Sequence, residues 1–279
     1  MCTVTFMPRR DGYCLGMNRD EKRSRPKGLP PAERNIHGRL VVYPSEPDGG
    51  TWIASNNTGA SLALINWYSA TARTRANTIS RGKIIPSLCT ADTAALVHAG
   101  LAAIPLDRIN PFRLIGVFPS SKEIIEWRWD LKELIRKDHR WRAQQWISSG
   151  FDESAAQKSR NKVFKQAQAQ KSVETIGWLR RLHRSHLPLV GPFSTCMHRD
   201  DAATVSYTEI SVRRGSATMR HICGPPCNGA VMASLLRCNP PAARGNAKGL
   251  LTFAGLRMAG QALARDPKEW LNISSGWGR

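Results

Sequence analysis

Apolar and polar residues alternate from the start of the chain, where residues 2–7 read Cys-Thr-Val-Thr-Phe-Met. This period of two predicts a strand. Residues 8–12, Pro-Arg-Arg-Asp-Gly, are typical of a turn, and residues 13–18 predict a returning strand. The resulting hairpin brings residues 18–20, Asn-Arg-Asp, back to the chain start, so a guanidinium and a carboxylate are expected beside Cys2.

The same periodicities predict the remaining elements. Residues 18–39 are rich in charge, Pro and Gly, which predicts a loop over the proposed site. Thr90 or Asp92 is available as an N-cap for one helix. Strands are expected at residues 39–43, 51–55, 61–66, 112–118, 124–129, 146–149 and 204–211, with a last strand ending near 222, and helices at 81–88, 91–101, from 152 and from 172.

The elements occur as hairpins, helices, more hairpins, helices and a closing hairpin. This order favours an antiparallel α+β sandwich with helices outside. The pattern alone does not distinguish one sheet from two.

The chain has 279 residues, of which 41% are hydrophobic, enough for a substantial core. It contains no run of eighteen apolar residues, so no transmembrane helix is expected. The apolar start is short and soon followed by charges, which is unlike a signal peptide. Its seven cysteines are an odd number and do not resemble a disulfide framework. We therefore expect a cytoplasmic protein with reduced thiols.

A net charge of +20 raises nucleic acid or an acidic membrane as partners. The basic residues are spread along the chain, however, with acids among them. The densest group, within residues 158–184, falls on predicted helices, where a solvated face is the commoner arrangement. No nucleic-acid-binding motif accompanies it, so no nucleic-acid partner is expected.

Cys2 has a chemical property that no other position shares if Met1 is removed, as is usual before a small residue. The residue then carries a thiol and a free α-amine, and the amine has an ordinary pKa of about 7.7–8.0. Near neutral pH it can accept the thiol proton, and the thiolate is the nucleophilic form. The alternative is that Cys2 is simply the second residue of a strand.

An ordered set of motifs resembles the NRDE family, which includes the transport-and-Golgi-organisation proteins. The family takes its name from the tetrapeptide found here at residues 18–21, and the resemblance covers roughly residues 1–222. The motifs are Cys2, Asn18-Arg19-Asp20-Glu21, Ser24-Arg25-Pro26, Gly49-Gly50-Thr51-Trp52-Ile53, Leu64-Ile65-Asn66, Ser80-Arg81-Gly82, Pro111-Phe112-Arg113-Leu114, Cys196-Met197-His198 and Thr204-Val205-Ser206.

The resemblance implies the four-layered αββα fold of N-terminal-nucleophile hydrolases. It also implies roles for single residues. Cys2 is the expected nucleophile and base, and Asp20 holds the α-amine and orients the thiol. Arg19 supplies a guanidinium at the thiolate. Asn66 ends a predicted strand where the related cysteine hydrolases carry an Asn whose amide lines the oxyanion hole.

Two departures from the hydrolase pattern affect these roles. In bile-salt-hydrolase and penicillin-acylase relatives the Arg lies three residues before the Asp, where this chain has Met17, so Arg19 is in doubt and Arg160 is the alternative cation. Ser149 stands where those hydrolases place a second Asn, and its hydroxyl is a weaker donor. Asn18 and Ser149 are expected to contact the substrate.

Two functions from different classes follow. The first is a cysteine amidohydrolase that cleaves a non-peptide C–N amide through a thioester on Cys2. The alternative is a non-enzymatic protein that handles haem or a lipid or acyl metabolite in the same pocket. The partner is accordingly a small-molecule amide or a hydrophobic ligand, and no cofactor is expected.

The last section, residues 223–279, lies outside the resemblance. It is basic and rich in Pro, Gly and Ala, and is predicted to be a poorly ordered tail after a domain of residues 1–222. His221, Cys223, Cys227 and Cys238 are residue types that bind zinc, but their spacing matches no strong pattern. No metal site is therefore expected.

Overall fold

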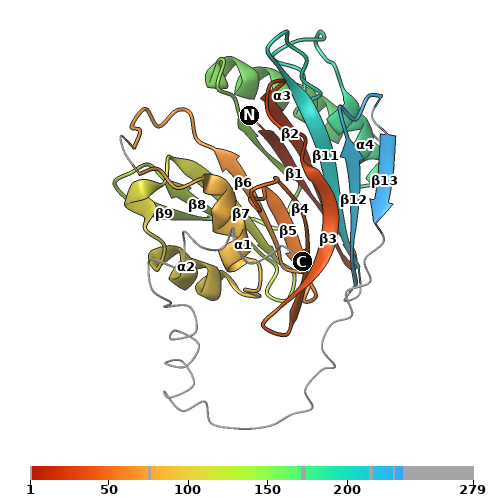
Figure 1. The fold of residues 1–279 in the computed structure, drawn as a ribbon. Coiled ribbons are helices and arrows are strands. Elements are labelled where there is room, and N and C mark those ends of the chain that lie inside the picture. The colour runs from red at the N-terminus through yellow and green to blue at the C-terminus, as the bar shows by residue number, and fades with distance from the viewer. Residues whose placement is uncertain (1, 75–76, 171–173, 214–215, 229, 235–279) are drawn as a thin grey trace, which may run out of the picture.

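Two antiparallel β-sheets form the centre of the protein, which is described here from a computed structural model (Figure 1). The structure describes residues 2–74, 77–170, 174–213, 216–228 and 230–234. The first sheet has the strand order β10-β1-β2-β11-β12-β13, and the second has the order β3-β4-β5-β6-β7-β8-β9. The strands are β1 (Cys2–Arg9), β2 (Gly12–Lys22), β3 (Leu29–Ile36), β4 (Arg39–Ser45), β5 (Ile53–Asn56), β6 (Ser61–Asn66), β7 (Phe112–Phe118), β8 (Glu123–Trp129), β9 (Leu134–His139), β10 (Gln144–Ser148), β11 (Ala202–Arg213), β12 (Ser216–Cys223) and β13 (Ala230–Ser234).

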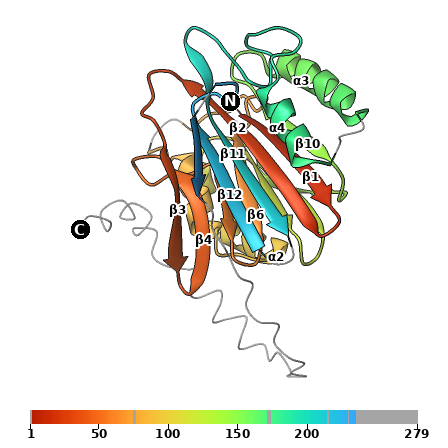
Figure 2. The ribbon, with the colours of Figure 1, turned by 90° about the vertical axis from the view of Figure 1, so that its right-hand side faces the viewer.

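Helices cover the outer faces of the two sheets (Figures 1 and 2). Within the described residues α1 (Ile84–Leu88) and α2 (Ala94–Ala102) pack on the second sheet through a shared apolar cluster. The first sheet packs against α3 (Glu153–Gln168) and α4 (Ile176–Arg184) through a cluster that includes Phe164 and Trp178.

The buried contact between the sheets follows the alternation seen in the sequence. Val4 and Phe6 of β1 point into the space between the sheets, where they meet Ile65 and Val117 of the second sheet. Met7, on the opposite face of β1, packs under α3 and α4. The layers are therefore helix, sheet, sheet, helix, which confirms the predicted α+β αββα sandwich.

The prediction of a loop over residues 18–39 is wrong for most of that range. β2 continues to Lys22, and Leu29–Ile36 is a strand, so residues 23–28 alone connect the two. Two prolines hid this strand from the sequence pattern. The strand lies at the edge of its sheet, with a register shift between Leu29 and Ala32, and Pro is tolerated in that position because an edge N–H needs no partner strand.

The structure also differs from the sequence-based expectations at another edge strand and at the starts of two helices. β9 was not predicted, because this second edge strand carries Arg136, Lys137 and Asp138 and is largely exposed. The cap of α2 is Thr93, whose hydroxyl accepts from Leu96 N at 3.2 Å. The helix predicted from residue 172 begins at Ile176, with Thr175 as its cap.

The first sheet continues beyond residue 222. β13 pairs with β12, from Cys223 opposite Ala230 to Met219 opposite Ser234. Part of the section predicted as a tail is therefore a strand, while residues 235–279, including Cys238, lie outside the described residues.

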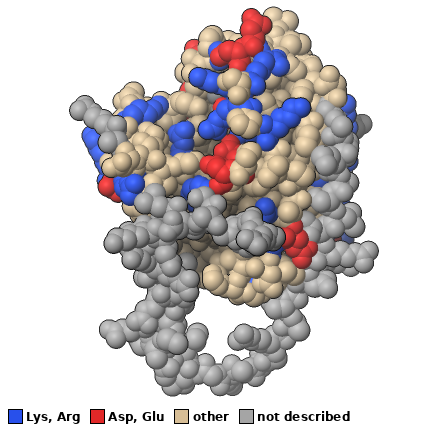
Figure 3. All heavy atoms as spheres, viewed as in Figure 1, with Lys and Arg blue, Asp and Glu red and all other residues tan. Residues whose placement is uncertain are grey.

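Basic and acidic side chains are mixed on the face seen in Figure 3, where Lys and Arg gather with acids among them. Several ion pairs reflect this mixing, such as Arg25 with Glu21 and Glu46, both at 3.1 Å. Among the described residues, no helix combines the length and the apolar character needed to span a membrane.

Candidate active site

Cys2 lies at the start of β1, between β10 and β2 in the first sheet. Its register partners are Ser148 and Arg19, so the predicted hairpin is confirmed. The thiol belongs to the face that looks toward the second sheet, and it opens into a cavity of about 540 Å³. The cavity is also lined by Arg19, Asp20, Glu21, Lys22, Arg25, Glu46, Thr51, Trp52, Leu64, Asn66, Tyr68, Thr78, Ile79, Ser80, Arg81, Gly82 and Asn110.

Opposing effects act on the Cys2 thiol. Burial raises its pKa, and the Asp20 carboxylate adds to that effect. The backbone N–H of Asp20 donates toward the sulfur, and the Arg19 guanidinium lies close enough to act on it, so both lower the pKa. Burial is the largest of these influences, so the pKa of the thiol is raised overall.

Arg19 faces the same side of the sheet as Cys2. The two residues are directly opposite in an antiparallel pair, and such partners share a face. The guanidinium stacks 4.3 Å above the Trp52 ring and forms a short ion pair with Glu46. Arg19 therefore lies on the thiol's side of the sheet, and its role as the cation at the thiolate stays a prediction.

Asp20 and Arg160 meet on the helix-facing side of β2. Both side chains are fully buried, and Arg160 Nη1 lies 3.3 Å from Asp20 Oδ2 and donates to Thr3 Oγ1 at 2.6 Å. Thr204 Oγ1 donates to Asp20 Oδ1 at 2.6 Å. Arg160 is thus an internal partner of Asp20 and does not line the cavity.

Asn66 stands at the end of β6, in the second sheet, and lines the cavity that the thiol enters. Its Nδ2 donates to the Tyr68 hydroxyl at 2.8 Å, which fixes the side-chain amide. An NH₂ group carries two donors. One donor of Asn66 is therefore left for a second acceptor.

The structure does not bring the two expected substrate ligands to this cavity. Asn18 is fully buried on the helix side, where Nδ2 donates to the carbonyls of His183 and Thr195 at 2.9 and 2.8 Å. Its Oδ1 faces His183 Nδ1 at 3.0 Å, so that nitrogen carries the proton. Ser149 is buried beyond the end of β10 and accepts from Phe151 N. Asn18 joins α4 to the sheet, and Ser149 shapes a turn.

Two other residues at the site carried no predicted role. Arg81 lines the cavity, and its interaction with the Cys2 sulfur is attractive. It lies in the Ser80-Arg81-Gly82 motif, which was the available signal. Ser148, the register partner of Cys2, is fully buried, and its hydroxyl has no hydrogen-bond partner among the described residues. The family resemblance pointed to Ser149, one position away.

Solved structures with the same architecture define the class of fold. A conjugated bile acid hydrolase from Clostridium perfringens, in a C2A mutant, matches with a TM-score of 0.53 and 9% identity over 88% of this chain and 100% of that chain. Penicillin V acylase from Agrobacterium tumefaciens matches with a TM-score of 0.52 and 12% identity over 84% of this chain and 86% of that chain. The fold is that of the N-terminal-nucleophile hydrolases.

A known protein family matches the first part of the chain. Residues 1–128 match the family described as Transport and Golgi organisation 2, which confirms the NRDE-family resemblance over that part of the chain. This match includes Cys2, residues 18–21 and Asn66. No curated protein matches the sequence.

Proposed function

We propose that the protein is a cysteine amidohydrolase that cleaves a non-peptide C–N amide. The observation that carries the proposal is the cavity itself, into which the Cys2 thiol, the Asn66 amide and the Arg19 and Arg81 guanidinium groups all open. The two solved structures described above are a hydrolase and an acylase, which agrees with the proposal at the level of fold alone.

The reaction requires Cys2 as the first residue of the mature chain. The α-amine takes the thiol proton, the sulfur attacks the amide carbon, and a C–S bond forms. The amine then gives this proton to the amide nitrogen, the C–N bond breaks and the product amine leaves. Water next attacks the thioester with its proton accepted by the α-amine, the C–S bond breaks as this proton passes to the sulfur, and a carboxylic acid and the free thiol result.

The surrounding groups have separate tasks. Because burial raises the pKa of Cys2, a fixed positive charge is needed where the thiolate forms, and Arg19 lies directly across the strand pair. The second donor of Asn66 would stabilise the oxyanion, an effect worth roughly 3–4 kcal/mol. Arg160 and Thr204 act through Asp20, since they hold its carboxylate.

Arg81 suggests the class of substrate. It donates to the carbonyl of Pro111 at 3.0 Å, but it forms no ion pair with an acid among the described residues, unlike Arg19 and Arg25 in the same cavity. Burial lowers its pKa, so an uncompensated charge is costly there. A substrate that carries a carboxylate would supply the missing partner.

Processing is tested first, by peptide mapping after brief exposure to a little iodoacetamide near neutral pH. We expect the terminal peptide to begin at Cys2, with its thiol alkylated ahead of the other cysteines. Retained Met1 in the purified protein would overturn the hydrolase proposal. A free thiol also requires a reducing compartment, so a cytoplasmic location is part of the proposal.

Hydrolysis is tested with a panel of N-acyl amides, with and without a carboxylate, by measuring the released amine. Protein that begins at Cys2 should hydrolyse the acidic members preferentially, and Arg81→Met should raise KM for them alone. Absence of turnover across the panel would favour the alternative, handling of haem or an acyl metabolite, which predicts ligand binding that persists when Met1 is retained.

A further inference from the structure

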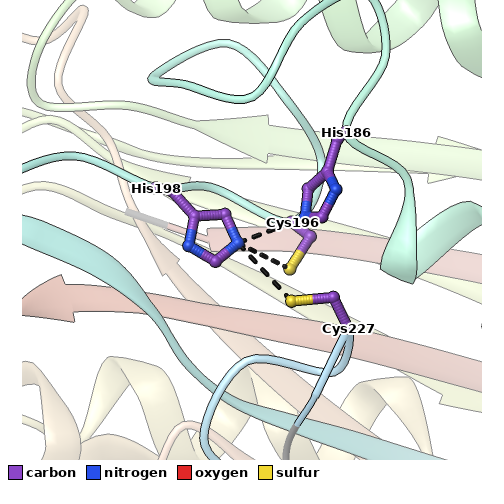
Figure 4. Close-up of side chains that lie close together, drawn as sticks. All are labelled: His186, Cys196, His198 and Cys227. Carbon is purple, nitrogen blue, oxygen red and sulfur yellow. Dashed lines mark hydrogen bonds between the residues drawn. The ribbon is translucent and has the colours of Figure 1, made fainter.

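Four metal-binding side chains from three parts of the chain converge outside the cavity at Cys2 (Figure 4). His186 follows α4, Cys196 and His198 lie in the segment before β11, and Cys227 follows β12. One ligand atom from each lies within 4.8 Å of all the others. In Figure 4 the two imidazole rings and the two sulfur atoms point toward one another.

Their separations match one tetrahedral ion. The Nε2 atoms of His186 and His198 are 3.2 Å apart, and His198 Nε2 is 3.5 Å from Cys196 Sγ and 3.6 Å from Cys227 Sγ. With zinc bonds of about 2.3 Å to sulfur and about 2.0–2.1 Å to nitrogen, a tetrahedron places two nitrogens about 3.4 Å apart and a nitrogen and a sulfur about 3.6 Å apart.

Hydrogen bonding does not account for the same geometry. His198 Nε2 faces three polar atoms, yet a neutral imidazole nitrogen carries either one proton or one lone pair. At most one of the three contacts can be a good hydrogen bond, and the other two bring polar atoms close to the nitrogen without a hydrogen bond. An ion at the centre would satisfy all four atoms at once.

The backbone holds these side chains in place. Cys196 N donates to Ser185 O at 3.0 Å, so the segment of Cys196 is tied to the end of α4, close to His186. His198 forms an isolated bridge with Ala203, at the start of β11. Arg184 donates to Cys227 O at 3.4 Å, which ties the third part of the chain to α4.

We propose that His186, Cys196, His198 and Cys227 bind a single Zn²⁺ ion in a structural Cys₂His₂ site. Four protein ligands complete a tetrahedron and leave no position for substrate, which is typical of structural zinc. The site differs from the combination of His221, Cys223, Cys227 and Cys238 considered from the sequence, with which it shares only Cys227. The expectation that the protein holds no metal is thereby replaced by a specific proposal.

The ion would join the turn after β12 to the segment before β11. That segment leads directly to the proposed catalytic centre, because Met197 N donates to Thr204 Oγ1 at 2.8 Å and Thr204 donates to Asp20. Loss of the ion would therefore loosen the support of Asp20 from the helix side. The effect on any activity would be indirect, through positioning.

The test measures zinc in the full chain purified under reducing conditions and dialysed against metal-free buffer. Elemental analysis should give about one zinc per chain, and Co²⁺ in its place should show tetrahedral d–d bands together with thiolate-to-metal charge transfer. Cys227→Ser and His186→Ala should each weaken zinc affinity at least about tenfold. Cys223→Ser is the matched control, since this partly exposed cysteine is only four positions before Cys227 and outside the group.

Three results would overturn the proposal. One is a wild-type chain that neither contains zinc nor takes up Co²⁺. Another is equal zinc content in wild type, Cys227→Ser and His186→Ala. The third is a Cys196–Cys227 disulfide, found by peptide mapping of protein kept under reductant. Far-UV circular dichroism of each variant distinguishes loss of a zinc ligand from loss of the fold. His186→Ala is the variant least expected to disturb packing, because His186 is half-exposed.

Discussion

The two thiol sites of this protein contain the same reactive group in opposite surroundings. Cys2 is a single sulfur that opens into a cavity of about 540 Å³ with guanidinium groups on the walls. Cys196 and Cys227 meet two imidazoles within 4.8 Å, and these four donors surround one point. A cation beside an open thiol favours a nucleophile, whereas converging lone pairs favour a metal.

Neighbouring elements therefore decide what a cysteine does. Cys2 is opposite Arg19 because β1 and β2 form a hairpin, a local arrangement. The Cys/His group depends on α4, β11 and β12 coming together, and its sequence spacing is irregular. Because the two sites depend on different elements, a substitution in one site should leave the other intact.

The largest expected effect is on catalysis. Cys2→Ala removes the nucleophile, so hydrolysis should fall by at least about 1000-fold, while the zinc content stays at the wild-type level. The amine-release assay and elemental analysis check the two halves of this prediction on one sample. Cys223→Ser should retain both properties. Turnover by Cys2→Ala at the wild-type rate would remove Cys2 from the mechanism.

The next effect is on stability. Arg160→Met leaves the Asp20 carboxylate buried without its cation, which should lower the free energy of unfolding by about 3–5 kcal/mol. Urea titration measures the loss. Arg136→Met is the control, because Arg136 pairs with Asp138 and Glu123 on an exposed edge and such pairs contribute about 0–1 kcal/mol. Equal losses in the two variants would show that Arg160 is not an essential partner of Asp20.

The next effect is on kcat and concerns the stabilisation of the oxyanion by Asn66. Asn66→Ala should lower kcat by about 100- to 1000-fold with little change in KM, because the amide acts on charge that develops only in the transition state. Steady-state kinetics with the best amide of the panel distinguish the two constants. Asn161→Ala, on the exposed side of α3, should leave both unchanged. A rise in KM alone for Asn66→Ala would make Asn66 a binding residue.

The smallest effect concerns His221, which lies between the two sites. With Arg19 and His198 it lines a second cavity of about 330 Å³, and its Nδ1 faces Thr208 Oγ1 at 2.9 Å. Burial, with a further contribution from Arg19, lowers the pKa of His221 to about 4. The unfolded chain therefore binds a proton at His221 more readily than the folded chain does. The free energy of unfolding is highest above pH 6.5 and falls by about 2–3 kcal/mol as the pH drops toward 4.

Urea titrations across that pH range measure the effect. His221→Gln should give a shallower decline than wild type, and the exposed His37→Asn should not. Part of the decline will persist in both, because burial also lowers the pKa of His183, to about 3. An unchanged slope in His221→Gln would mean that His221 does not titrate in this window.

Much of the framework was accessible from the sequence because it depends on local patterns. Period-two alternation located the strand around Val4, while a turn signal and an apolar run located those around Ile65 and Val117, and all three bury a face against the other sheet. The two edge strands of the second sheet were missed for the opposite reason. β3 contains prolines and β9 is charged, and neither needs the apolar pattern of a covered strand.

In the candidate site, too, the local contacts could be predicted from the sequence and the long-range contacts could not. Alternation and the turn predicted at residues 8–12 indicated that Cys2 and Arg19 would meet in a hairpin, and the NRDE motif indicated the family that residues 1–128 match. Only the tertiary structure decided that Asn18 contacts α4, that Arg160 belongs to Asp20, and that four Cys and His side chains share one point. Those contacts join segments far apart in the chain, and they depend on sheet order and helix packing, which no local periodicity encodes.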